Sequence, residues 1–144
     1  MRRRALLKGM GTGAMMSVLS SIEGFGQTDA ASSDGVVFEL RVYHTFEGKL
    51  NDLLARFRDH TMTIFKRHGI ESVAYWTPLD EPLKNKTLFY ILKHPNRAAA
   101  TANWAAFRAD PEWKSVSAAS EVNGKLVEKV DSTYLKLTDF SPKL

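Results

Sequence analysis

The feature that most constrains the fold of this 144-residue chain is a switch in hydrophobic period after residue 43. Residues 36–43 alternate as a half-buried strand does. One face of this strand carries Phe38, Leu40 and Val42, and the other carries Glu39, Arg41 and Tyr43. Residues 48–68 then place apolar side chains at helical spacing, and Gly69 follows where a helix-ending glycine is expected. The pattern predicts a strand followed by a long amphipathic helix.

The remaining segments continue the alternation of strands and helices. Residues 70–76, 87–93 and 125–138 have the composition of strands. Asn96 and Asp110 can each cap a helix, and Pro111 suits the first turn of the second one. The order strand, helix, strand, strand, helix, strand predicts an α+β, ferredoxin-like βαββαβ sandwich over residues 36–144, with the helices on one face of an antiparallel sheet.

Such a sheet leaves its second face open in a monomer. We expect this open face to carry the polar side of the first strand, Glu39, Arg41 and Tyr43. The third strand is expected to add Tyr90 or Phe89, and the last strand Tyr134 or Lys136. A large exposed face of this kind is normally covered. The simplest cover is a second copy, which would give a homodimeric α/β barrel.

Residues 1–30 are interpreted as a twin-arginine signal peptide and leader. Arg3, Arg4 and Lys8 precede a short, weakly apolar run that ends near Glu23, in the order typical of a cleavable export signal. The run is shorter than the roughly 20 apolar residues that span a membrane. We therefore expect export to the periplasm and no membrane attachment after cleavage.

Composition excludes several classes of function. Of 20 Lys and Arg residues four precede residue 27, and of 16 Asp and Glu residues one does, so the mature domain is nearly neutral. A nearly neutral domain gives no reason to expect nucleic-acid binding. The chain has no cysteine, phosphate loop or metal-ligand pattern, and we expect neither a metal nor a cofactor.

Two charged residues of the first strand are the main candidates for a binding site. Glu39 and Arg41 share a face that we expect to become interior, so each must be paired or bind something. They could pair with each other, within one subunit or across the dimer. Alternatively, Arg41 could hold an anionic group of a ligand, with Tyr43 and Trp76 as apolar walls and Tyr90 beside them.

His60 is the remaining candidate, because a histidine titrates near neutral pH. It lies at the flank of the apolar stripe of the first helix, where it could instead be a buried hydrogen-bonding residue. Trp104 and Trp113 sit at helical positions typical of core residues. The basic residues along the first helix, including Arg56, are interpreted as a solvated face.

Six ordered segments resemble the NIPSNAP family, and the likeness runs from Val37 to Pro142. These are ELRVY (39–43), LLARFRDHT (53–61), FKRHGI (65–70), AYW (74–76), FRADPEW (107–113) and TDFSP (138–142). The resemblance implies a dimeric α/β barrel of the superfamily that includes antibiotic-monooxygenase type proteins. It carries over no catalytic residues, because the family has no agreed catalytic motif.

Two hypotheses of different class follow. The first is a periplasmic binding or accessory module, a homodimer that holds a small, partly apolar ligand or docks onto a partner. The second is a cofactor-independent oxygenase or isomerase that uses His60, Tyr43 or Arg41 in the barrel cavity. A buried, solvent-reachable His60 beside Arg41 with a strongly shifted pKa would favour the enzyme, and a cavity filled by its own side chains would favour a structural or interaction role. Haem binding is a third alternative, based only on the histidines and the export route.

Overall fold

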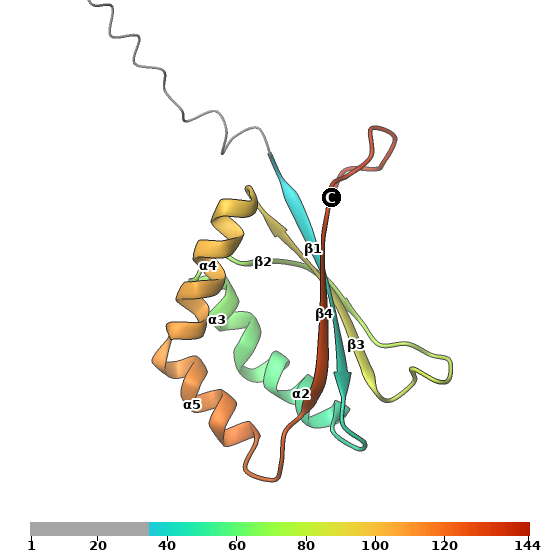
Figure 1. Cartoon of the computed structure of the whole chain (residues 1–144), viewed down its shortest axis with the longest axis vertical. Coiled ribbons are helices and arrows are strands. Elements are labelled where there is room, and N and C mark those ends of the chain that lie inside the picture. The colour runs from blue at the N-terminus through green and yellow to red at the C-terminus, as the bar shows by residue number, and fades with distance from the viewer. Residues whose placement is uncertain (1–34) are drawn as a thin grey trace, which may run out of the picture.

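The computed structural model describes residues 35–144, and the predicted signal and leader, residues 1–30, lie outside this range. Four strands and two helical segments follow one another along the chain in the predicted order (Figure 1). The strands are β1 (Val37–Thr45), β2 (Glu71–Trp76), β3 (Thr87–His94) and β4 (Val127–Leu135). The helices are α2 (Leu50–Arg56), the π-helical turn η1 (Phe57–Thr61), α3 (Met62–Arg67), α4 (Arg97–Ala109) and α5 (Pro111–Ser120).

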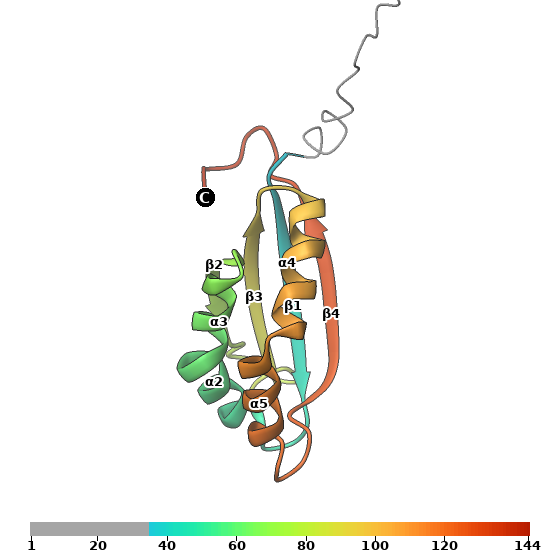
Figure 2. The same cartoon turned by 90° about the vertical axis from the view of Figure 1, so that its left-hand side faces the viewer.

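The predicted α+β, ferredoxin-like fold is confirmed. The strands form one four-stranded sheet in the order β2-β3-β1-β4, and each neighbouring pair is antiparallel. All the helices lie on one face of this sheet, as the two perpendicular views show (Figures 1 and 2). No helix within residues 35–144 is long and apolar enough to cross a membrane.

Local capping signals fix the helix ends as predicted. Asn96 accepts a hydrogen bond from the Ala99 backbone at 2.7 Å, and Asp110 accepts one from the Glu112 backbone at 2.8 Å. Each side chain satisfies a backbone donor that the first helical turn leaves free. Gly69 follows α3 with a φ of 73°, a left-handed conformation that glycine adopts at little cost.

The first long helix differs from the prediction in one respect. It is interrupted by the π-helical turn η1, in which the Met62 backbone N–H donates to the carbonyl of Phe57. The buried Thr61 hydroxyl also donates to the Arg56 carbonyl at 3.2 Å. A turn of this kind holds one residue more than an α-helical turn and therefore changes which side chains face the sheet. Apolar spacing alone does not reveal it.

The core lies between the sheet and the helices and is rich in aromatic rings. Phe57 stands near its middle, with ring centroids 5.3 Å from Tyr90, 5.7 Å from Tyr75 and 5.8 Å from Tyr43, all edge-on. Edge-on pairs of this geometry add about 0.5–1.5 kcal/mol each beyond burial. The tyrosines of three strands therefore pack against the π-helical turn.

The prediction of which face of β1 is open was wrong. Glu39 contacts Trp104 of α4, and Tyr43 packs on Phe57, so the polar face of β1 lies under the helices. Strand alternation groups side chains by face but does not say which face is covered. The helices cover the polar face here because its charges and hydroxyls are paired with one another.

The open face is consequently the apolar one. Within residues 35–144, no helix packs on this apolar face of the sheet (Figures 1 and 2). The pairing registers bring together on this face Leu40, Val42, Ala74, Trp76, Phe89, Ile91 and Leu135. Trp76, expected as a wall beside Arg41, lies instead on this open face, where it is 49% exposed.

Candidate functional site

The carboxylate of Glu39 is the centre of a buried polar cluster. Its Oε2 accepts hydrogen bonds from His94 Nε2 at 2.9 Å and from Trp104 Nε1 at 2.8 Å. Its Oε1 accepts from Arg41 Nη1 and from the Ser132 hydroxyl, each at 2.8 Å. Glu39 is only 1% exposed, yet both of its oxygens are satisfied. The cost of burying the charge is therefore offset by donors from β1, β3, α4 and β4.

Arg41 is held as completely as the carboxylate that it faces. Besides Glu39, its guanidinium donates to the hydroxyls of Tyr90 at 3.0 Å and Tyr43 at 3.4 Å. The same group lies over the ring of Trp104, 4.4 Å from its centroid. Of the two readings of Arg41, the geometry shows the pair with Glu39 inside one subunit.

The environment shifts the pKa of each charged member in the direction that keeps it charged. Burial alone would raise the pKa of Glu39, but the hydrogen bonds, the one from His94 foremost, outweigh it and lower the pKa to about 2. Burial opposes the charge of Arg41, whereas Tyr43, Tyr90 and Glu39 raise its pKa above the ordinary value. Both members of the pair are therefore ionised at neutral pH.

Four of the six predicted site residues meet in this cluster: Glu39, Arg41, Tyr43 and Tyr90. The other two lie elsewhere, Trp76 on the open sheet face and His60 on the helical side. Sequence reasoning missed His94 and Ser132, and it assigned Trp104 to the core without its hydrogen bond. The spacing of His94 from Tyr90 places both on one face of β3, which was the available signal.

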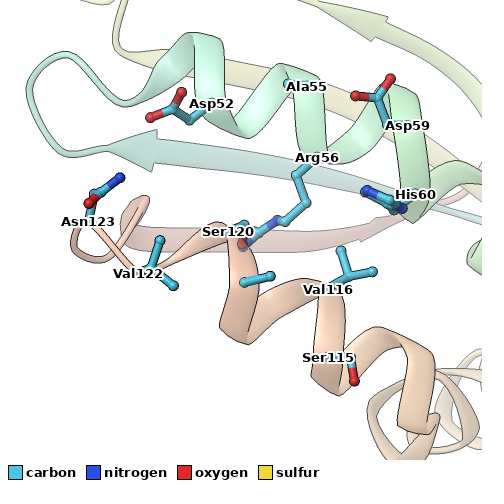
Figure 3. Close-up of a pocket in the computed structure, with 11 residues that line it drawn as sticks. Asp52, Ala55, Arg56, Asp59, His60, Ser115, Val116, Ser120, Val122 and Asn123 are labelled. Atoms are coloured by element: carbon cyan, nitrogen blue, oxygen red, sulfur yellow. The ribbon is translucent and has the colours of Figure 1, made fainter.

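A groove separates the first helical segment from α5 (Figure 3). Its volume is about 560 Å³. The lining residues are Asp52, Ala55, Arg56, Asp59, His60, Ser115, Val116, Ala119, Ser120, Val122 and Asn123. It opens on the helical side of the molecule, and the apolar sheet face is on the other.

Arg56 crosses this groove from α2 toward Ser120 of α5 (Figure 3). The prediction of a solvated side chain was wrong, because the Arg56 side chain is only 6% exposed. Its position three residues after the core residue Leu53 was the signal for burial. The other basic residues near it on this helix, Arg58 and Lys66, are exposed as predicted.

His60 is exposed on the π-helical turn and lines the same groove. In the described part of the chain, Arg41 is hydrogen-bonded to Glu39, Tyr90 and Tyr43 and not to His60, so the two candidates that an enzyme would need together are apart. Within residues 35–144, no group of three or more His, Cys, Asp or Glu side chains could hold a metal ion.

A family model described as NIPSNAP matches residues 38–142, which is most of the chain. No curated protein matches the sequence of this chain. Among solved structures, an uncharacterised NIPSNAP-like domain protein from Burkholderia xenovorans superposes with a TM-score of 0.67 and 17% identity, over 77% of this chain and 92% of that one. A NIPSNAP family protein of unknown function from Agrobacterium tumefaciens gives 0.65 and 24%, over 76% and 94%.

The same fold occurs in a protein of known activity. SnoaB, a cofactor-independent oxygenase from Streptomyces nogalater, superposes with a TM-score of 0.50 and 14% identity, over 76% of this chain and 99% of that one. At such identities the likeness concerns the fold alone.

Proposed function

This chain belongs to the NIPSNAP family, and we propose that it is an exported homodimer that serves as a binding or accessory module for a small ligand or partner. The observation that carries the proposal is the division of the molecule into two faces. One is an apolar sheet face suited to a second copy, and the other is a helical face with a groove.

The apolar sheet face supports dimerisation. Its central residues, Leu40 and Ile91, are paired across β1 and β3, and Trp76 stands 49% exposed at one side. Soluble monomers rarely keep a contiguous apolar surface of several strands exposed. A second sheet packed on it would bury these side chains, and two equivalent copies related by a two-fold axis would satisfy both faces at once.

The groove supports a ligand-binding role better than the Glu39 cluster does. Both charges of that cluster already have partners at 2.8–3.0 Å, so a ligand could bind Arg41 only by breaking them. The groove, in contrast, has space and combines apolar walls with a few polar groups, as small-molecule sites do.

The alternative, a cofactor-independent oxygenase or isomerase, has less support. It requires a titratable group and a charge partner in one cavity, and His60 and Arg41 lie apart. The Glu39–Arg41 cluster is filled by its own side chains, which favours a structural or interaction role for this part of the molecule.

Sedimentation velocity of the mature protein at micromolar concentration tests this proposal. The expected species has twice the mass of the mature chain. A monomer would rule out the homodimer. It would also contradict the proposal that the sheet face serves dimerisation while the helical face binds a ligand.

A further inference from the structure

Arg41, which is half-buried, and Arg56, which is buried, differ in how many hydrogen bonds their guanidinium groups make. Arg41 donates hydrogen bonds to Glu39, Tyr90 and Tyr43. Arg56 donates one, to the Ser120 hydroxyl at 3.1 Å, within residues 35–144. A guanidinium has five N–H donors, and an arginine this deeply buried normally uses several of them.

The nearest carboxylate, that of Glu121, adds no hydrogen bond to the Arg56 guanidinium. Glu121 Oε1 lies 3.7 Å from Arg56 Nη1, beyond hydrogen-bond distance, and the Glu121 side chain is 36% exposed. Arg56 Nε is fully buried and has no hydrogen-bond partner in the described part of the chain. The remaining support is the ring of Trp113, whose centroid lies 5.2 Å from the guanidinium carbon.

The environment of Arg56 therefore opposes its charge. Burial lowers the pKa of Arg56, and Tyr43, Glu121 and Tyr90 only partly counteract that. A cation held in this way gains more from an added anion than a satisfied one does, because the desolvation cost has already been met by folding. Arg56 also lines the groove, so its charge is adjacent to a space that a ligand can enter.

We propose that the groove between α2–η1 and α5 binds a small molecule with one carboxylate on an apolar body, and that the carboxylate pairs with Arg56. This inference rests on the proposed binding function and names the class of ligand. Apolar contacts come from Val116, Val122 and Ala119. Asp52 and Asp59 also line the groove, and their negative charges repel any anion, so a carboxylate is expected to bind only where it pairs directly with Arg56.

The three tryptophans allow a direct test, because each reports on a different place. Trp113 stacks on Arg56, Trp104 belongs to the Glu39 cluster, and Trp76 lies on the open sheet face. Their indole N–H signals in a ¹⁵N-labelled protein can be assigned with single Trp→Phe variants. The probes are hexanoate and 4-phenylbutyrate, each compared with its own neutral amide.

We expect both carboxylates to shift the Trp113 signal saturably and to bind about 10- to 100-fold more tightly than their amides, the usual difference for a charge-assisted hydrogen bond. Arg56→Met should lose this preference while its melting temperature stays equal to or above that of the wild type, because an apolar side chain suits the buried site. Arg56→Gln, which can still reach Ser120, is the second variant should Arg56→Met fail to fold. Arg58→Met, an exposed neighbour, is the matched control and should bind as the wild type does.

Three results would overturn the inference. Equal binding of acid and amide, unchanged binding by Arg56→Met or Arg56→Gln, and no shift of Trp113 with either carboxylate each contradict a carboxylate on Arg56. Shifts confined to Trp76 or Trp104 would also do so, while leaving a ligand-binding dimer intact. Sedimentation velocity tests the proposed function independently of these titrations, because a monomer would contradict the homodimer whatever the carboxylates do.

Discussion

Arg41 Nη1 lies 2.8 Å from Oε1 of Glu39, a carboxylate that the fold buries almost completely. Both residues stand on β1, two positions apart, and the donors that complete the cluster come from β3, β4 and α4. This pair ties the helices to the middle of the sheet through Trp104. It is a structural element, and its loss should affect stability first.

Arg41→Met should destabilise the protein by about 3–5 kcal/mol, because it leaves the Glu39 charge buried without its cation. The double variant Glu39→Gln with Arg41→Met should recover much of that loss. Chemical denaturation of the three proteins measures both effects, and Arg58→Met, at an exposed position, should change stability by less than about 0.5 kcal/mol. Wild-type stability of Arg41→Met would instead mean that Arg41 serves a ligand.

Acid should weaken the wild-type protein through Glu39. Its pKa is lowered from 4.5 to about 2 by the fold, so its contribution is fully present above pH 4.5 and is lost as the pH falls through 2. The lowered pKa corresponds to about 3 kcal/mol at neutral pH. Thermal melts at pH 6 and pH 2 should therefore show the difference between wild type and Glu39→Gln shrinking in acid. A difference that stays constant over that range would contradict the ionised cluster.

A charge at the centre of the open sheet face should prevent dimerisation. Ile91→Lys places an ammonium where the second sheet is proposed to pack, opposite Leu40 of β1. We expect a monomer with an unchanged circular dichroism spectrum. Leu79→Lys is the control, because Leu79 is 84% exposed in the β2–β3 connection and should leave the assembly unaltered. If Ile91→Lys sediments like the wild type, the interface lies elsewhere.

Export by the twin-arginine route remains a proposal and has its own test. Replacing Arg3 and Arg4 with Lys should keep the precursor in the cytoplasm, since this pathway reads the arginine pair. Fractionation and immunoblotting measure the effect. An unchanged periplasmic yield in a strain that lacks the twin-arginine translocase would contradict the proposal.

The order and type of the elements could be predicted because each depends on local signals. The alternation of β1, the caps at Asn96 and Asp110 and the glycine after α3 act within a few residues. Which face of β1 the helices cover could not be predicted in this way. It depends on hydrogen bonds from Trp104 and His94 to Glu39, and both residues lie more than fifty positions away along the chain. Polar residues on a strand indicate solvent only when nothing distant pairs with them.

For the candidate site, too, the local pattern predicted some residues and failed for others. Strand alternation correctly grouped Glu39, Arg41 and Tyr43, whereas Trp76 was assigned to their face and lies on the other one. Arg56 was missed because a charged residue on a helix usually faces water, and the π-helical turn that follows it is invisible to apolar spacing.

Native mass spectrometry of the protein purified from its own compartment tests the central claim most directly. The account predicts twice the mass of the mature chain together with a retained small molecule, and it predicts that this added mass is missing from Arg56→Met. A monomer without any retained molecule would contradict both the dimer and the binding role.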